Sequence, residues 1–423
     1  MTAVLLVGLA LLLALSVPIA VTLGLSATAA LQSSGAPLVM LAQSVYESLD
    51  SFGLMAIPFF VLAGTLMQSG GIARRLVDLA NALVGWIKGG LGACAVLTSM
   101  FFATMSGSSS ATTAAIGSVL IPAMEKKGYP RSLAGAIAAS SGELGVIIPP
   151  SIPMIVYALA ANVSVADLFL AGVLPGLLIG LSLIGTIYVL ARIKGFDVVG
   201  HITLGQWSTN LVHAFKRASL AILMPVLILG GIYGGIFTAT EASVVAVIYG
   251  LVIGLYVYKE LRWRDLIGML GRSAITSSII LLIVGFASIF AYVLTVNQVP
   301  HRVGAFVTGI SKDPLVFLLA VNVLLVLIGM FMETLAAIII LAPILAPAAI
   351  AYGIDPVHFG AVMVVNLAIG MVTPPVGVNL FVVCQVANVR LEQLVRPLLV
   401  FLGVLIVDVL LVTYIPALTT WFR

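Results

Sequence analysis

Long apolar segments, separated by short polar stretches, follow one another along most of the chain. Segments of about 20 apolar residues are long enough to cross a bilayer as helices. Such helices are predicted at 3–24, 52–69, 166–191, 218–236, 238–258, 273–296 and 397–420. Polar residues continue from the first helix to Asp50, and a polar loop is predicted at 194–217. The pattern predicts an all-α polytopic membrane protein.

Four further apolar segments are too short for full spans and pair into two hairpins. The legs of the first, at about 89–105 and 109–124, flank the polar run Ser106–Ser110. The legs of the second lie at about 313–331 and 335–351. Non-helical backbone at membrane depth is tolerated only where protein surrounds it. We therefore expect two re-entrant helical hairpins, at about 89–124 and 313–351.

A long apolar segment with a double proline follows each hairpin. These segments span 132–160, with Pro149-Pro150, and 357–386, with Pro374-Pro375. Two successive prolines remove two amide donors and clash with the preceding turn, so each helix must break. The residue before a proline is pushed towards extended geometry. The carbonyl groups of Ile148 and Thr373 are therefore predicted to be free to face a ligand.

The two hairpin regions are related by an internal repeat. A shift of 225 residues superposes several glycines, both double prolines and two acidic residues. The pairs are Pro122/Pro347, Gly128/Gly353, Gly135/Gly360, Gly145/Gly370, Pro149-Pro150/Pro374-Pro375 and Asp167/Glu392. Duplication explains this ungapped run better than chance. We expect a first repeat at 1–193, a cytoplasmic loop and connecting helix at 194–237, and a second repeat at 238–423.

The composition and the charge distribution agree with a membrane protein. Hydrophobic residues make up 62% of the chain and charged residues 8%, against about 25% charged in soluble domains. If the loop 126–131 is cytoplasmic, only Arg302, Lys312 and Arg423 of the 19 Lys and Arg residues fall outside. Lys and Arg accumulate in cytoplasmic loops. This predicts a cytoplasmic amino terminus, a periplasmic carboxy terminus and inverted repeats, a plan common among secondary transporters.

The hairpin tips and broken helices are the candidate binding sites. Carbonyl groups at half-helix ends suit a small cation, half-helix N-termini suit an anion, and hydroxyl groups add neutral ligands. The predicted sodium ligands are Ser106, Gly107, Ser108, Ser109, Gly145, Ile148 and Pro149 in the first repeat, and Gly329, Met330, Gly370, Thr373 and Val376 in the second. The predicted substrate residues between the tips are Ser110, Thr112, Pro150, Ser151, Glu333, Thr334, Pro375 and Asn379. The alternative is that these small residues only permit close helix packing.

The same segments resemble the large membrane (M) subunit of tripartite ATP-independent periplasmic (TRAP) transporters, within the ion transporter superfamily. The resemblance covers essentially the whole chain. Its motifs are Asp50–Phe52 with Met55–Gly64, the serine run at 106–110, Ile148–Ser151, Thr240–Ala242 and Thr373–Gly377. A proline expected near Gly53-Leu54 is absent.

The resemblance implies an elevator mechanism, with a scaffold and a transport domain, that imports a small organic acid with sodium into a bacterium. It implies two partners: a periplasmic substrate-binding protein and a small four-helix membrane (Q) subunit, which we expect to be a separate chain in the inner membrane. Sodium is the expected coupling ion, and no cofactor is expected.

Other function classes fit less well. No His-Glu-x-x-His zinc motif occurs, and no histidine lies at the depth of the serine run, so we expect no enzyme activity. Proton coupling is the alternative to sodium, because Glu143 and Glu333 lie beside the proposed ion sites and intramembrane carboxylates are functional candidates. A passive channel is the other alternative.

Overall fold

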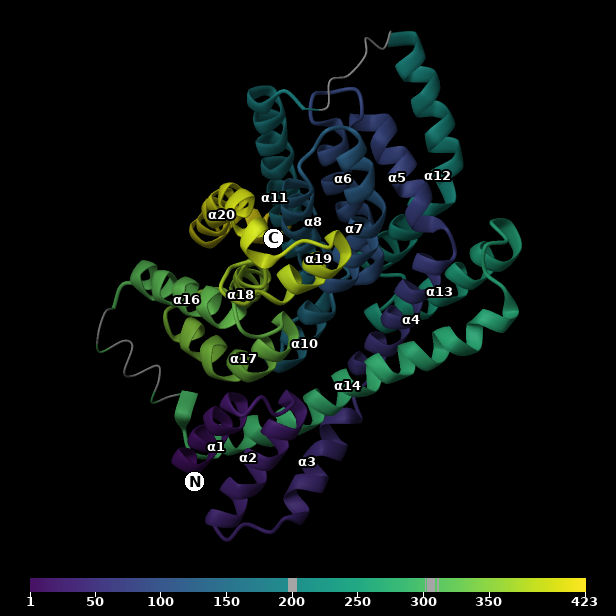
Figure 1. Ribbon diagram of the computed structural model, residues 1–423. Helices are drawn as coiled ribbons and strands as arrows, with labels where there is room; N and C mark the ends of the chain where they lie inside the picture. Colours follow the sequence, from purple (N-terminus) through teal and green to yellow (C-terminus); the bar gives the residue numbers. More distant parts are fainter. Residues whose placement is uncertain (197–203, 301, 303–308, 310–311) are drawn as a thin grey trace.

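The computed structural model describes residues 1–196, 204–300, 302, 309 and 312–423. Every regular element in this part of the chain is a helix (Figure 1). Seven described helices are long and apolar enough to span a membrane, and a bent pair adds an eighth. Many large apolar side chains on these helices are exposed, as a bilayer environment allows. The chain is therefore a multi-pass, all-helical membrane protein, as predicted.

The amino-terminal region differs from the sequence prediction. It contains α1 (Thr2–Ala14), α2 (Ile19–Ser33) and α3 (Val39–Leu49). The single helix predicted at 3–24 is wrong, because the chain breaks before Pro18, which has no amide hydrogen to donate. The polar stretch up to Asp50 also includes the helix α3. A short 3-10 helix, η1 (Phe52–Met55), then leads into α4 (Ala56–Ser69), close to the predicted 52–69.

The polar loop predicted at 194–217 is also partly wrong. The helix α12 (Leu204–Tyr233) begins inside it and packs against α5 (Ile72–Val84). Trp207, Leu211, Ala214 and Ala218 recur at helical spacing, which marks an amphipathic helix. Trp207 packs edge-on against Trp86, with ring centroids 6.2 Å apart. The connecting helices α13 (Ala239–Val252), with the π-helix η2 (Ile253–Val257), and α14 (Trp263–Val296) complete this region.

Both hairpins and both broken helices are present near their predicted positions. The first set comprises α6 (Gly90–Ser106), α7 (Ser109–Lys126), α8 (Arg131–Gly142), α9 (Leu144–Ile147), α10 (Ile152–Ala160) and α11 (Val165–Lys194). The second comprises α16 (Pro314–Gly329), α17 (Thr334–Ala351), α18 (Pro356–Gly370), α19 (Val378–Ala387), α20 (Leu391–Tyr414) and α21 (Ala417–Thr420). The chain bends by 42° at the first double proline. The helices α7 and α17 begin and end at positions related by the same shift of 225 residues.

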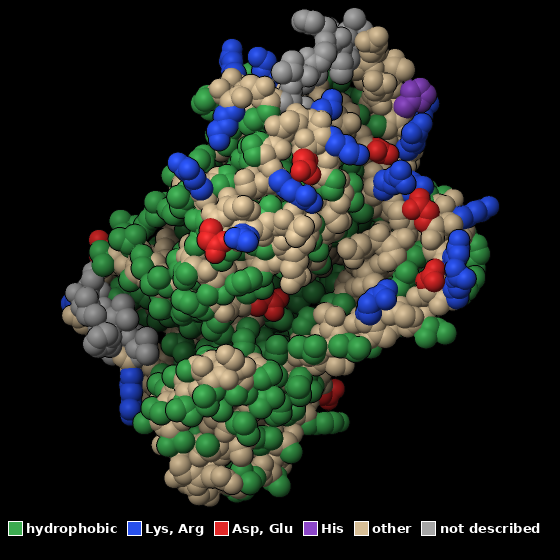
Figure 2. Space-filling view, in the orientation of Figure 1, with side chains coloured by type: hydrophobic (Ala, Val, Ile, Leu, Met, Phe, Trp, Pro, Cys, Tyr) green, Lys and Arg blue, Asp and Glu red, His purple; other side chains and the backbone are tan. Residues whose placement is uncertain are grey.

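The helices form two groups that meet along one boundary (Figure 1). The first group, α6–α11 with α16–α21, holds both hairpins: α7 packs on α8 and α19, and α18 packs on α16, α11 and α20. The second group, α1–α5 with α12–α14, runs along the lower and right side of Figure 1. At the boundary, α5 and α4 pack on α6, and α14 packs on α17. Figure 2 shows most of the Lys and Arg side chains on this face over the upper and right part of the molecule, although one also stands at the lower left, near the amino-terminal helices.

Candidate functional site

Hydroxyl groups crowd the tip of the first hairpin. Ser108 ends the turn in an extended conformation, and its side chain accepts the amide of Ala111 at the start of α7. The hydroxyl oxygens of Ser106 and Thr112 lie 2.7 Å apart. The Thr112 hydroxyl also donates to the Ser108 carbonyl at 2.8 Å. The tip therefore concentrates neutral oxygen atoms where α6 ends and α7 begins.

Gly145 packs directly against these oxygen atoms. A Cβ at this position would lie 2.4 Å from the Thr112 hydroxyl oxygen and 2.5 Å from the Ser108 carbonyl oxygen. Both distances are too short for a side chain, so the glycine lets the α9 backbone approach two oxygen atoms, the ligand type that a sodium ion takes at unwound helix ends. Of the predicted first-repeat ligands, Ser106, Ser108 and Gly145 come together here.

The tip lies directly on the first double-proline turn. A Cβ on Gly107, which has φ +57°, would lie 3.1 Å from the Pro150 carbonyl oxygen and 3.3 Å from the Ile152 amide nitrogen. Ile148 is extended, as expected before a proline. Ser151 is fully buried and caps α10 by accepting the Met154 amide. Only glycine permits this close approach of the two turns.

The second hairpin meets its broken helix mainly through backbone. A Cβ on Gly370 would lie 2.5 Å from the Gly329 Cα, and the Gly377 amide donates to the Met330 carbonyl at 2.8 Å. The Thr373 hydroxyl donates to the Ile369 carbonyl at 2.7 Å. Gly329, Met330, Gly370 and Thr373 therefore lie close together, with Val376 next to Gly377 in the same turn. Fewer side-chain oxygens gather here than at the first tip.

A buried polar cluster connects the two hairpin sets behind the first tip. The Ser109 hydroxyl donates to one Glu143 carboxylate oxygen at 2.8 Å. The Asn379 amide nitrogen donates to the other oxygen and to the Ser109 hydroxyl. Glu143 and Asn379 are fully buried. Glu143 and Asn379 were each candidate residues from the sequence, but their contact was not predictable, since 236 positions separate them.

A cavity of 320 Å³ lies between the first tip and the helices α4 and α14. Ser106, Gly107, Ser108, Ser110 and Glu333 line one side of it. Residues at the N-termini of three helices border the cavity: Ser110 and Ala111 of α7, Ile152 and Pro153 of α10, and Leu335 of α17. None of the described lining residues is Lys or Arg. Helix N-termini carry partial positive charge, so this cavity can favour a small anion without a basic side chain.

The predicted substrate residues divide into two sets. Ser110 and Glu333 line the cavity. The others lie outside its lining. Thr112 forms hydrogen bonds within the tip, and Ser151 caps α10. Asn379 contacts Glu143, and the Thr334 hydroxyl oxygen lies 3.0 Å from the Met371 sulfur. Pro150 is buried beneath Gly107, and Pro375 is exposed in the second turn.

Three polar residues that line the cavity were missed by sequence reasoning. They are Thr65 and Gln68 of α4 and Thr276 of α14. The Ser273 hydroxyl donates to Thr65 at 3.1 Å, which joins α14 to α4. A polar side chain within an otherwise apolar span is a candidate site residue by default. The sequence shows polar side chains in these two apolar spans, but it does not show that both helices face a hairpin tip.

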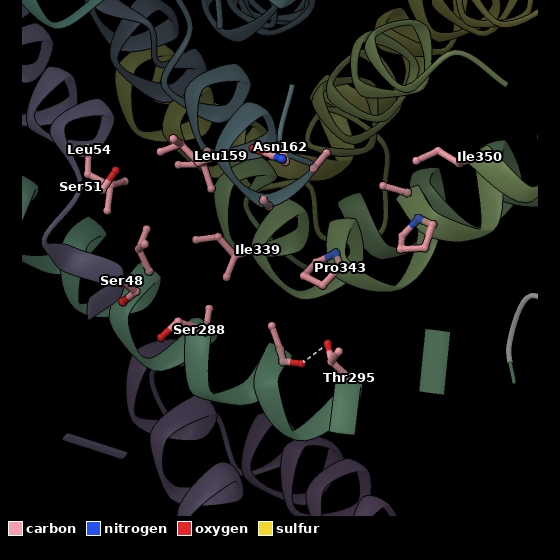
Figure 3. Close-up of a pocket in the computed structure, with 18 residues that line it drawn as sticks. Ser48, Ser51, Leu54, Leu159, Asn162, Ser288, Thr295, Ile339, Pro343 and Ile350 are labelled. Atoms are coloured by element: carbon pink, nitrogen blue, oxygen red, sulfur yellow. Dashed lines mark hydrogen bonds between the residues drawn. The ribbon is translucent and has the colours of Figure 1, made fainter. Parts of the chain in front are cut away.

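A second cavity, of 570 Å³, opens where the two helix groups meet. Figure 3 shows Ser288 and Thr295 of α14 on one side and Leu159, Asn162, Ile339 and Pro343 on the other. The Ser288 and Thr295 hydroxyls donate to backbone carbonyls of Ser44 and Ala291, at 3.1 and 2.8 Å. Most of the other lining residues are apolar, and the two hydroxyls already donate hydrogen bonds to backbone carbonyls.

The chain matches the family model of the tripartite ATP-independent periplasmic transporter, DctM component, over residues 6–418. It is 45% identical to the isethionate TRAP transporter permease protein DctMQ of Oleidesulfovibrio alaskensis, over 98% of this chain and 65% of that protein. The chain thus spans just under two thirds of that relative. It is 46% identical to the C4-dicarboxylate TRAP transporter large permease protein DctM of Pseudomonas aeruginosa, over 90% of this chain and 88% of that protein.

A solved structure shows the same fold at low sequence identity. The YdaH transporter of Alcanivorax borkumensis superposes with a TM-score of 0.63 and 18% identity, covering 89% of this chain and 88% of that chain. The relatives are named as transporter permeases rather than enzymes. The match over residues 6–418 and the identity to two TRAP permeases lead to one conclusion: the chain belongs to the DctM component family of tripartite ATP-independent periplasmic transporters.

Proposed function

We propose that the chain is the large membrane subunit of a sodium-coupled secondary transporter that imports a small organic anion. The observation that carries this proposal is the 320 Å³ cavity, bordered by three helix N-termini and by the first hairpin tip, whose hydroxyl and carbonyl oxygens pack on Gly145. An anion in the cavity and a cation at these oxygens would share the Ser106–Ser108 tip. Each would then favour the binding of the other, and this coupling must be reciprocal.

The ion sites follow from the two hairpin tips. The first sodium ion would take oxygen atoms of Ser106–Ser109 and carbonyls near Gly145, Ile148 and Pro149. The second would take carbonyls around Gly329, Met330, Gly370 and Val376, with the Thr373 hydroxyl. Glu333 at the cavity is the feature that favours the alternative, proton coupling, because a carboxylate beside an anion must be neutralised.

The substrate class follows from the cavity and from the named relatives. One relative is named for isethionate, a sulfonate, and another for C4-dicarboxylates. Both are small organic anions. A site built from helix N-termini and hydroxyl groups suits either type of oxyanion, so the proposal is limited to a small organic acid.

Two partners are part of the proposal. The family is described as tripartite, and the DctMQ relative is longer than this chain. We propose a small four-helix membrane (Q) subunit, which would cover part of the exposed apolar surface of α1–α5 and α12–α14. A periplasmic substrate-binding protein would deliver the anion.

An elevator movement would carry the site across the membrane. The two groups of helices support this: both hairpins and both broken helices lie in one group, and α4 and α14 of the other face the cavity. The largely apolar 570 Å³ cavity lies along the same boundary. The hairpin group would move as the transport domain against a fixed scaffold.

The charge distribution supports one orientation of the hairpins. We assign the loop Lys126–Arg131 to the cytoplasm and the carboxy terminus to the periplasm. The ion pairs are consistent with it: Arg75 pairs with Glu260 at 2.7 Å on the assigned cytoplasmic side, and Arg423 pairs with Asp167 at 3.2 Å and with Asp355 on the other. The cytoplasmic amino terminus stays a prediction, since α1 and α2 are 13 and 15 residues long, shorter than a full span.

Two substitutions test the proposed ion sites. Thr373→Val removes a hydroxyl but keeps the shape of the side chain. Ser108→Ala removes a hydroxyl at the first tip. Each should raise the sodium concentration needed for half-maximal uptake by tenfold or more. Ser108 also caps α7, so the matched control is Ser164→Ala, which removes a comparable cap from α11 far from the tips. Uptake with unchanged sodium dependence in both variants would mean that the tips are packing devices.

A further inference from the structure

The buried carboxylate of Glu143 has no cation beside it in the described part of the chain. None of the ion pairs there includes Glu143, although its side chain is fully buried. Ser109 and Asn379 each donate a hydrogen bond to it, which is the pattern expected around an ionised acceptor. An ionised carboxylate away from water is strongly unfavourable unless it is paired with a positive charge.

Two buried oxygen atoms close to Glu143 have no hydrogen-bond partner. They are the Asn379 amide oxygen and the Thr113 hydroxyl oxygen, and both residues are fully buried. The Asn379 oxygen belongs to the same amide group whose nitrogen contacts Glu143. Thr113 lies one helical turn after Ser109, and its hydroxyl oxygen would be 1.8 Å from a Cβ on Gly142, the residue before Glu143. Buried polar atoms without a partner are rare and call for an explanation.

One ligand would satisfy all three groups. We propose that a further sodium ion binds between α7, the junction of α8 and α9, and α19, held by the Glu143 carboxylate, the Asn379 amide oxygen and the Thr113 hydroxyl oxygen. This inference rests on the proposed function for the identity of the ion. The site is separate from the first proposed ion site beside Gly145, because Thr112 faces Gly145 whereas the next residue, Thr113, faces Gly142.

The position of this site gives it a role in coupling. Thr113 and Glu143 belong to the first hairpin set, and Asn379 lies at the start of α19 in the second. An ion held by all three would fix α19 against the first hairpin. The two tips that border the proposed substrate site would then be held in register only when the ion is bound.

Binding to the purified chain tests the proposal without relying on transport. Radioactive sodium would be counted per chain, and the unfolding temperature would be followed as sodium replaces choline, since a ligand that binds the folded state stabilises it. Glu143→Gln keeps the size and one acceptor oxygen but removes the charge and turns the other oxygen into an NH2 donor. It should bind one sodium ion fewer per chain. Glu125→Gln, at an exposed carboxylate on the same hairpin, should bind as many as the parent chain.

Thr113→Val keeps the test informative if Glu143→Gln fails to fold. A hydroxyl that is merely unpaired should be replaced by a methyl group at no cost to stability. The proposal expects that the sodium-free protein is at least as stable as the parent, while the sodium concentration for half-maximal stabilisation rises tenfold or more. Unchanged sodium affinity in Thr113→Val, with unchanged stoichiometry in any folded Glu143→Gln, would overturn the proposal.

Two outcomes separate this inference from the proposed function. If the parent chain binds sodium and its uptake depends on sodium, but Glu143→Gln alters only the pH dependence of uptake, the group carries a proton and the extra sodium site is wrong. If the parent chain binds no sodium and its uptake ignores sodium, the proposed function itself fails.

Discussion

At Gly145 the absence of a side chain lets the backbone approach a hydroxyl and a carbonyl oxygen closely. A Cβ here would lie 2.4 Å from the Thr112 hydroxyl oxygen and 2.5 Å from the Ser108 carbonyl oxygen. A glycine within a helix normally weakens it by about 1 kcal/mol relative to alanine. An alanine here would gain that preference, but its methyl group would clash with both oxygens, so the hairpin tip would have to shift.

Gly145→Ala should lower sodium affinity at least tenfold, because the new methyl group would displace those two oxygens from their present positions. A tenfold loss corresponds to about 1.4 kcal/mol. The measurement is the sodium dependence of uptake in vesicles. Gly117→Ala is the matched control: it lies in α7 of the adjoining hairpin, and its Cβ would meet only ordinary contacts, at 3.4 Å or more. Equal sodium dependence in the two variants would contradict the assignment of these oxygens to the ion site.

Sequence alone could locate the tips at this scale but not all of their partners. The serine run and the double prolines are local signals, and the structure places them in contact through Gly107 and Pro150. The contact between Glu143 and Asn379 has no local signal. The position of Thr65 and the other polar residues of α4 and α14 at the cavity could likewise not be predicted, because the sequence of a single apolar span does not indicate which helix it packs against.

Among the elements, the hairpins and broken helices were predictable because proline and glycine act on the backbone directly. The helices α3 and α5, the break at Pro18 and the start of α12 were missed, and the last two show different reasons. The break at Pro18 lies within an otherwise continuous apolar run, so hydropathy masks it. The start of α12 is amphipathic, with its apolar face against α5, and a count of apolar residues treats such a segment as a loop.

The opposite orientation of the two hairpins can be tested by labelling. Lys126 and Ala351 are exposed equivalents at the ends of α7 and α17. With Cys94 and Cys384 replaced by serine, a single cysteine at position 126 should react with an impermeant maleimide only from the cytoplasmic side. A cysteine at position 351 should react only from the periplasmic side. Labelling of both from one side would contradict the inverted arrangement.

For the whole molecule, the arrangement into two helix groups predicts dependence on partners. If a substrate-binding protein delivers the anion and a Q subunit completes the scaffold, the purified chain alone should not accumulate free substrate. Adding both partners should restore uptake, and adding only one should not. Concentrative uptake of free substrate by the chain alone would contradict this dependence. The fully assembled system is the control for the quality of the vesicles.

The most direct test of the account is uptake in vesicles that contain the chain with both partners, with the sodium and proton gradients imposed separately. The candidate anions would include isethionate and a C4-dicarboxylate. A sodium-coupled importer should accumulate the anion above equilibrium when only an inward sodium gradient is imposed, and a proton gradient without sodium should not drive accumulation. Accumulation driven by the proton gradient in the absence of sodium would contradict sodium coupling.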